Sequence, residues 1–166
     1  PRPPAPMTAA NTNASSHSSA DGLDARILVD ARYLRGQTSG IGRYVGNVVR
    51  CCLELDPTVR FELITHPDNP TPIDDPRVTT QTFDATPNSL KDSLLLARSV
   101  DFDRADLFHA PANLIPLGAV PTPTLLTLHD VMWLRGTGYW TDRWWREATT
   151  GTFYRTMIPR SVDAAD

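Results

Sequence analysis

Apolar side chains follow two patterns along the chain: short continuous runs and positions at helical spacing. Continuous runs of this length suit strands that are buried on both faces of a parallel sheet. Such runs lie within residues 26–31, 61–65, 106–110 and 124–128, and the β-rich stretch V-T-T-Q-T-F at 78–83 predicts a further strand. Stretches with one apolar face predict helices from residue 42 to 56, from 88 or 89 to 100, and from 141 to 160. Strands that alternate with helices favour an α/β fold, with a Rossmann-like, mostly parallel sheet and flanking helices.

The first strand, a glycine-bearing loop and the first helix form the most informative segment. The strand ends at Asp30, the loop contains Gly36, Gly40 and Gly42, and an amphipathic helix then continues almost to Pro57. Free N–H groups and the helix dipole attract anions at a helix start, and glycine lets a ligand approach the backbone. The spacing alone predicts phosphate contact and an ordinary glycine turn about equally.

Two nucleotide-binding motifs do not fit this loop. A dinucleotide-binding fingerprint needs a third glycine where Val45 stands, and a carboxylate after the second strand, where the chain has His66. A P-loop needs Gly-Lys-Ser/Thr, which the segment lacks. The loop is therefore neither of these motifs.

Polar residues stand at the ends of four predicted strands. Asp30 ends the first strand and His66 follows the second. His109 lies near the end of the fourth, and His129 and Asp130 follow the fifth. Because ligands of parallel sheets bind beyond the carboxyl ends of the strands, these residues and the glycine loop predict one shared site. Taken singly, each histidine is more often a structural residue that is hydrogen-bonded to the backbone.

Other classes of site find little support in the sequence. No histidine pair has zinc-ligand spacing, no G-x-S-x-G elbow is present, and the adjacent Cys51 and Cys52 suit neither a disulfide nor a metal site. The formal net charge of −3 gives no bulk attraction to nucleic acid. No apolar run approaches the roughly 20 residues that a membrane span needs, and residues 1–25 lack the apolar core of a secretory signal. We therefore expect a cytoplasmic protein without a metal.

The two ends of the chain differ from its middle. Residues 1–25 are rich in Pro, Ala, Ser, Asn and Thr and predict a disordered tail, because they bury too little apolar surface to offset chain entropy. Residues 26–166 predict one α/β domain. Since the sequence begins at Pro1 and stops at Asp166, directly after a predicted helix, we expect a fragment of a longer protein.

Tryptophans and arginines gather near the C-terminal end of the chain. The favoured interpretation is an aromatic core with solvated arginines. The alternative is contact with a membrane interface, which would suit a lipid-linked substrate. The residues concerned are Trp133, Trp140, Trp144, Trp145, Arg135, Arg143 and Arg146.

Three motifs together resemble bacterial glycosyltransferases of family 4, and in style their mannosyltransferase-like members. They are D-A-R…T-S-G-I-G-R-Y at residues 30–44, F-H-A-P at 108–111 and T-L-H-D-V at 127–131. The final I-P-R-S-V-D-A-A-D, from Ile158, is similar to the segment before the next strand of the same domain. The resemblance covers residues 26–166.

This resemblance implies a GT-B fold, in which two Rossmann-like domains face each other across a cleft. The chain would be the N-terminal, acceptor-side domain, incomplete at its C-terminal end, with the C-terminal, donor-binding domain as its missing partner. The intact enzyme would transfer a hexose such as mannose from a nucleotide sugar to a glycan or lipid-linked acceptor, with retention, in polysaccharide biosynthesis. The nucleotide sugar is a co-substrate, and no cofactor or metal is implied. The place of action would be the cytoplasm or the inner face of the cell membrane, and the chain alone would be inactive.

The resemblance also assigns roles to residues of the site. His129 and Asp130 would be catalytic, beside the transferred sugar. The loop that approaches the donor phosphate would contain Gly40, Gly42 and Arg43. The acceptor-side candidates are Asp30, Tyr44 and His109.

Two alternative functions stay open at the level of sequence. One is a non-catalytic half-transferase, which would act as a binding or regulatory module with a separate donor-binding chain. The other is a different GT-B enzyme, such as a nucleotide-sugar epimerase.

Overall fold

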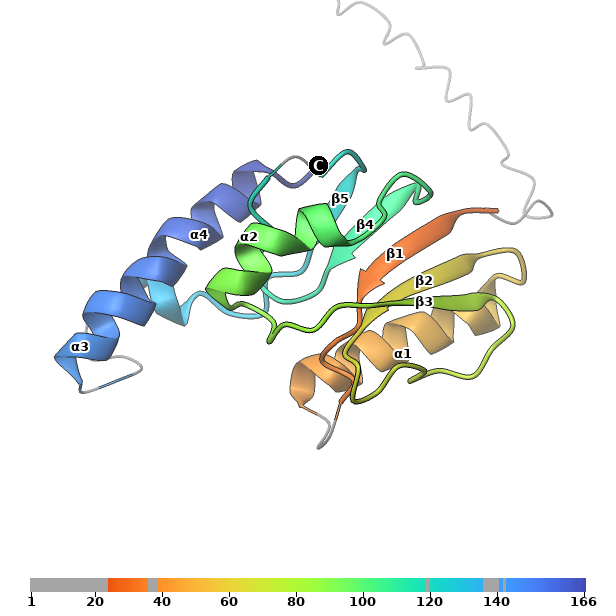
Figure 1. The fold of residues 1–166 in the computed structure, drawn as a ribbon, viewed down its shortest axis with the longest axis horizontal. Helices are drawn as coiled ribbons and strands as arrows, with labels where there is room; N and C mark the ends of the chain where they lie inside the picture. The colour runs from red at the N-terminus through yellow and green to blue at the C-terminus, as the bar shows by residue number, and fades with distance from the viewer. Residues whose placement is uncertain (1–23, 36–38, 119, 136–140, 142) are drawn as a thin grey trace, which may run out of the picture.

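The structure, a computed structural model, describes residues 24–35, 39–118, 120–135, 141 and 143–166. They form an α/β domain whose five-stranded sheet has the order β3-β2-β1-β4-β5 (Figure 1). All four neighbouring pairs of strands are parallel. The strands are β1 Arg26–Asp30, β2 Arg60–Thr65, β3 Val78–Thr82, β4 Leu107–Ala110 and β5 Thr124–Leu126. The predicted Rossmann-like parallel sheet is therefore confirmed.

Two long helices follow β1 and β3 and begin with serine caps. Helix α1 spans Gly40–Leu55, and the Ser39 hydroxyl accepts a hydrogen bond from the Gly42 N–H at 3.0 Å. Helix α2 spans Leu90–Ser99, and the Ser89 hydroxyl accepts one from the Asp92 N–H at 3.1 Å. Each serine satisfies one of the N–H groups that a helix start leaves without an intrahelical partner.

The central strand β1 is buried between these helices because it is apolar on both faces. Leu28 and Val29 are neighbours in β1, yet their exposed fractions are only 0% and 1%. Val29 packs in a core with Val45 and Val49 of α1, whereas Leu28 packs in a separate core with Leu96 of α2. The continuous apolar run of the first strand was therefore correctly interpreted as a strand covered on both sides.

The predicted helix at residues 141–160 is wrong in its continuity. The structure has α3 Trp144–Arg146, the π-helical turn η2 Glu147–Gly151, and α4 Thr152–Asp163. The Thr149 hydroxyl donates to the Trp145 carbonyl oxygen at 2.8 Å, and such back-bonding by threonine distorts helices. Thr149, Thr150 and Gly151 are also weak helix formers, so the regular α-helical pattern is lost where they cluster.

Two predicted elements differ slightly in where they begin or end, and some predicted features lie in residues that the structure does not describe. Helix α1 begins at Gly40 instead of residue 42, because Ser39 caps it there. Strand β5 ends at Leu126, after which a short 3-10 helix, η1, spans Met132–Leu134. Residues 1–23 of the predicted tail lie outside the described residues, as do Gly36 and Trp140.

Candidate functional site

Four side chains meet where β4 and β5 end beside α1, and we call Tyr44, His109, Thr127 and His129 the rim cluster. The Thr127 Oγ1 atom lies 3.0 Å from the Tyr44 hydroxyl and 2.8 Å from His109 Nε2. The Tyr44 ring stands edge-on to both imidazoles, with centroids 5.9 Å from His109 and 5.1 Å from His129. The structure thus brings together three predicted site residues that are far apart in the sequence.

His109 is the buried member of the rim cluster. It pairs with Val29 across the sheet, so it lies on the face that α1 covers. Burial lowers the pKa of His109, and the neighbouring His129 lowers it further. The imidazole is therefore neutral at neutral pH, and its hydrogen bond to Thr127 is one between uncharged groups.

His129 is exposed, and its hydrogen bonds fix how its ring can act. Its Nε2 lies 2.7 Å from the Pro111 carbonyl oxygen. Because a carbonyl oxygen only accepts, Nε2 must carry a proton, and in the neutral ring Nδ1 is then the acceptor. Among the described residues, nothing is hydrogen-bonded to Nδ1, so this atom can accept a hydrogen bond from a ligand hydroxyl.

Asn113 positions His129 and was missed at the level of sequence. Its side-chain oxygen accepts a hydrogen bond from the His129 N–H at 2.8 Å, and its own N–H donates to the Thr127 carbonyl oxygen at 3.0 Å. Asn113 has a positive φ of 64°, a conformation that asparagine tolerates better than most residues. Its position in the loop after the F-H-A-P motif was the only available signal.

Asp130 follows His129 in the chain, but its side chain contacts the backbone of η1. Its carboxylate accepts a hydrogen bond from the Met132 N–H at 3.2 Å, at the start of η1. This hydrogen bond ties the carboxylate to η1 and not to the rim cluster. Its observed role is to support the turn into η1.

The two glycines of the predicted phosphate loop are not equivalent. A Cβ atom at Gly42 would lie 2.5 Å from the Tyr33 carbonyl oxygen, whereas one at Gly40 would meet nothing within 4 Å. Gly42 therefore permits close packing of α1 against the loop after β1, and its N–H is already bonded to Ser39. Within the described residues, the N–H groups of Gly40 and Ile41 have no hydrogen-bond acceptor, and Arg43 is exposed in the same turn.

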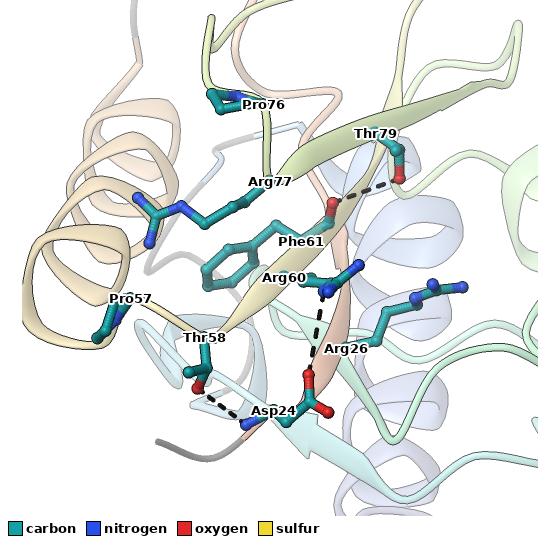
Figure 2. Close-up of a pocket in the computed structure, with 9 residues that line it drawn as sticks. All are labelled: Asp24, Arg26, Pro57, Thr58, Arg60, Phe61, Pro76, Arg77 and Thr79. Atoms are coloured by element: carbon teal, nitrogen blue, oxygen red, sulfur yellow. Dashed lines mark hydrogen bonds and ion pairs between the residues drawn. The ribbon is translucent and has the colours of Figure 1, made fainter. Parts of the chain in front are cut away.

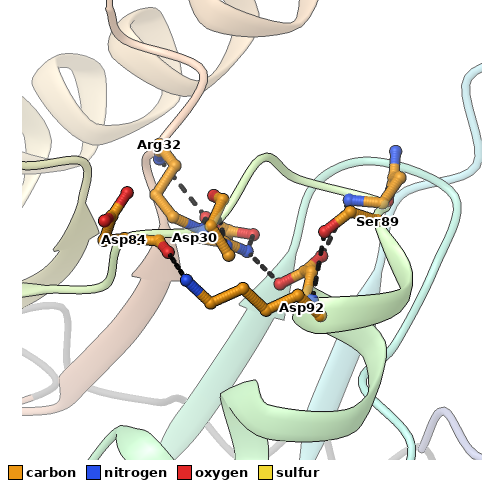
Figure 3. Close-up of polar contacts among 8 residues, drawn as sticks. Asp30, Arg32, Asp84, Ser89 and Asp92 are labelled. Atoms are coloured by element: carbon orange, nitrogen blue, oxygen red, sulfur yellow. Dashed lines mark hydrogen bonds and ion pairs between the residues drawn. The ribbon is translucent and has the colours of Figure 1, made fainter.

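Asp30, an acceptor-side candidate, lies in a buried ionic network with Arg32 and Asp92 (Figure 3). Arg32 donates from Nε and Nη2 to the Asp30 carboxylate, at 2.8 and 2.6 Å, and from Nη2 to Asp92 at 2.7 Å. The Arg32 side chain is completely buried, and it also donates to the Ala85 carbonyl oxygen at 3.1 Å. The network joins the end of β1 to α2 and to the segment before it, which is a structural role.

The charges and the burial of this network shift the pKa values of Arg32 and Asp92. Burial by itself would lower the pKa of Arg32, but the hydrogen bonds and charges of Asp30 and Asp92 raise it above its ordinary value. Burial raises the pKa of Asp92 more than the attraction of Arg32 lowers it. The arginine is therefore permanently charged, and it is the partner on which both carboxylates depend.

His66 stands at the same end of the sheet but outside the rim cluster. Its Nδ1 lies 3.1 Å from Asp68, and its Nε2 lies 3.4 Å from Asp84. The predicted shared rim is thus divided into three groups: the ionic network, the His66 contacts and the rim cluster.

A pocket of about 460 Å³ lies at the opposite, amino end of β1, β2 and β3 (Figure 2). Two of its three arginines already face carboxylates. Arg77 contacts Asp75 at 3.0 Å and also donates to the last carbonyls of α1, while Arg60 lies 4.0 Å from Asp24. This pocket lies at the end of the sheet opposite the rim cluster, so we do not assign the function to it.

Comparisons with known proteins assign neither a family nor a site to this chain. Family models, curated proteins and solved structures gave no match to the chain. In the part of the chain that the structure describes, no group of three or more His, Cys, Asp or Glu side chains is arranged to hold a metal ion. No helix among the described residues has the length and apolar character to cross a membrane.

Proposed function

We propose that this chain is the N-terminal, acceptor-side part of a retaining family 4 glycosyltransferase. The observation that carries the proposal is the convergence of the three resembling motifs. Tyr44 ends the first motif, His109 belongs to the second, and Thr127 and His129 belong to the third. These residues meet in the rim cluster through contacts that join positions 83 and 18 apart in the sequence.

The place and the chemistry of the rim cluster support a sugar site. The cluster lies at the carboxyl ends of parallel strands, which is where α/β sheets bind ligands. His129 Nδ1 suits a sugar hydroxyl as an acceptor. The N–H groups of Gly40 and Ile41, at the start of the 16-residue helix α1, suit the donor diphosphate, because a helix start favours anions.

In the proposed reaction, the bond between the hexose C1 and the diphosphate oxygen breaks, and its electron pair leaves with the nucleoside diphosphate. A bond forms between C1 and an acceptor hydroxyl oxygen, and the hydroxyl proton passes to the leaving diphosphate or to solvent. Backbone N–H groups near Gly40 would stabilise the charge that develops on the diphosphate. A second domain with most donor contacts, no metal, and a cytoplasmic or inner-membrane-face location belong to the same proposal.

The test is a transfer assay on the full product of the gene that encodes this chain, with GDP-mannose and other nucleotide hexoses as donors. His129→Ala should lower kcat/KM by roughly 100-fold or more, the scale expected for a positioned catalytic imidazole. His66→Ala is the matched control, because this histidine lies at the same end of the sheet outside the cluster. Wild-type turnover by His129→Ala, or release of an epimerised nucleotide sugar instead of a glycoside, would overturn the proposal.

A further inference from the structure

A pocket of about 300 Å³ lies where the start of α2 meets η2 and α4. Figure 1 shows the first turn of α2 beside α4, on the side of the sheet away from α1. The pocket belongs neither to the rim cluster nor to the buried ionic network. It is lined by Asn88, Leu90, Thr149, Thr150, Phe153 and Tyr154.

The π-helical turn builds one wall of this pocket. A π turn widens the helix locally, and such turns are frequent at functional sites. Here the turn contributes Thr149 and Thr150 to the lining. The Thr149 hydroxyl is used inside the helix, where it donates to the Trp145 carbonyl oxygen. Thr150 is the second residue of this turn that lines the pocket.

Asn88 and Leu90 build the opposite wall. Asn88 is held at a positive φ of 61°, and its N–H donates to Asp92 at 2.7 Å, so its backbone is fixed. Leu90 is 68% exposed at the start of α2, which is high for a leucine beside a pocket. The wall thus offers an apolar surface next to an amide.

The floor of the pocket is aromatic and uncharged. The rings of Phe153 and Tyr154 lie edge to face, with centroids 5.4 Å apart. Burial raises the pKa of Tyr154, and the hydrogen bond with Asn88 opposes this only in part, so the phenol is neutral at neutral pH. A pyranose ring has the complementary character: an apolar C–H face that stacks on aromatic rings, and hydroxyl groups around its edge.

The pocket adjoins the segment that follows His129. The Tyr154 ring stacks on Trp133 of η1, with centroids 4.3 Å apart and planes at 17°. Since η1 begins three residues after His129, a ligand against Tyr154 lies near the segment that carries His129.

We propose that this pocket is an acceptor subsite that takes one neutral pyranose ring, packed against Phe153 and Tyr154 beside Leu90. Its role as an acceptor subsite rests on the proposed function, whereas its affinity for a sugar ring does not. The proposal selects a glycan over a lipid chain as the group bound here. A long apolar chain would need an apolar groove without the amide and hydroxyls of Asn88 and Thr150.

The experiment is an NMR titration of this chain with methyl α-mannopyranoside and methyl α-glucopyranoside, followed through its backbone amides. We expect saturable shifts at Leu90, Thr150 and Phe153 for at least one of them, with Kd in the millimolar range. Leu90→Ala should weaken this binding by about threefold to tenfold. Leu94→Ala is the matched control, because Leu94 is also exposed on α2 but does not line the pocket.

Each outcome decides one point. The proposal is overturned if neither glycoside gives saturable shifts at these amides, if Leu90→Ala binds like Leu94→Ala, or if only octyl β-glucoside below its micelle concentration binds. His129→Ala should leave the titration unchanged, since His129 does not line the pocket. If the transfer assay overturns the proposed function but the glycoside still binds, the pocket remains a sugar-binding site. If no glycoside binds but transfer depends on His129, the proposed role of the rim cluster stands without this subsite.

Discussion

The ends of β1 and of β4–β5 carry similar polar residues but differ in what those residues can do. At the end of β1, Asp30 is paired with a completely buried Arg32, and its carboxylate is enclosed. Near the ends of β4 and β5, His109 is buried and neutral, whereas His129 is exposed with Nδ1 available. Polar residues in equivalent strand positions thus stabilise the fold in one place and form a candidate site in the other.

The difference follows from the elements that cover each strand end. Helix α2 brings Asp92 over the end of β1 and completes the ionic network around Arg32. The segment after β5 leaves the sheet, and Asn113 and Pro111 hold His129 by hydrogen bonds to its backbone and one ring nitrogen. A ligand can therefore reach the second place but not the first, and this contrast leads to four predictions.

The largest effect on stability should come from Arg32→Met. Two buried carboxylates would lose their cation, and breaking a buried ionic network in this way costs about 3–5 kcal/mol of unfolding free energy. Urea denaturation measures the loss. Arg98→Met, on the exposed surface of α2, should change the free energy of unfolding by less than about 0.5 kcal/mol. Equal effects of the two substitutions would show that the network is not structural.

Gly42→Ala should be the next most damaging change, at about 1–3 kcal/mol, because its Cβ would press against the Tyr33 carbonyl oxygen. Gly40→Ala is its control, since open space surrounds that position and alanine favours the helix. Thermal denaturation should therefore show opposite shifts for the two variants. A clear loss of donor binding by the stable Gly40→Ala variant would in addition support backbone contact with the phosphate.

Two substitutions at Asn113 distinguish the stability that comes from its backbone conformation from the stability that comes from its side-chain hydrogen bond. Asn113→Gly keeps the positive φ but loses the bond to the His129 N–H, which should cost about 1 kcal/mol. Asn113→Ala should cost about 1–2 kcal/mol more, because alanine disfavours this backbone conformation. Urea denaturation of both variants tests this order, and equal stability of the two would contradict it.

The smallest effect should be a pH dependence contributed by His109. Its pKa in the folded protein lies below the unfolded value, so the unfolded state binds more protons in between. The contribution of His109 to stability is therefore complete above the unfolded pKa of about 6.5 and falls as the pH drops below it, by at most about 1.4 kcal/mol per pH unit.

The measurement is urea denaturation at several pH values between 5 and 8 for wild type and His109→Gln. The wild type should lose more stability than the variant as the pH falls from 7 to 5. Parallel curves would mean that His109 does not titrate differently in the two states. The difference between the proteins, and not either curve alone, isolates this histidine from the carboxylates.

Much of the fold could be predicted because its signals are local. Each signal lies within a short stretch of sequence. Examples are the apolar runs of β1, β2 and β4 and the helical spacing of α1. The π turn at Glu147–Gly151 was not predicted, because helical periodicity continues across it and only the bonding of Thr149 reveals the change. Likewise, Arg32 and Asp92 are 60 residues apart, and no local pattern pairs them.

The sequence by itself determined the parallel α/β fold and the end of the sheet at which polar residues gather, because alternation of strands and helices constrains both. It also supplied Tyr44, His109 and His129 as candidates. Only the tertiary structure decided that Asp30 is enclosed, that Thr127 joins Tyr44 to His109, and that His129 presents Nδ1. Burial and hydrogen-bond partners depend on contacts between segments distant in the chain, and these arise only when the whole domain has packed.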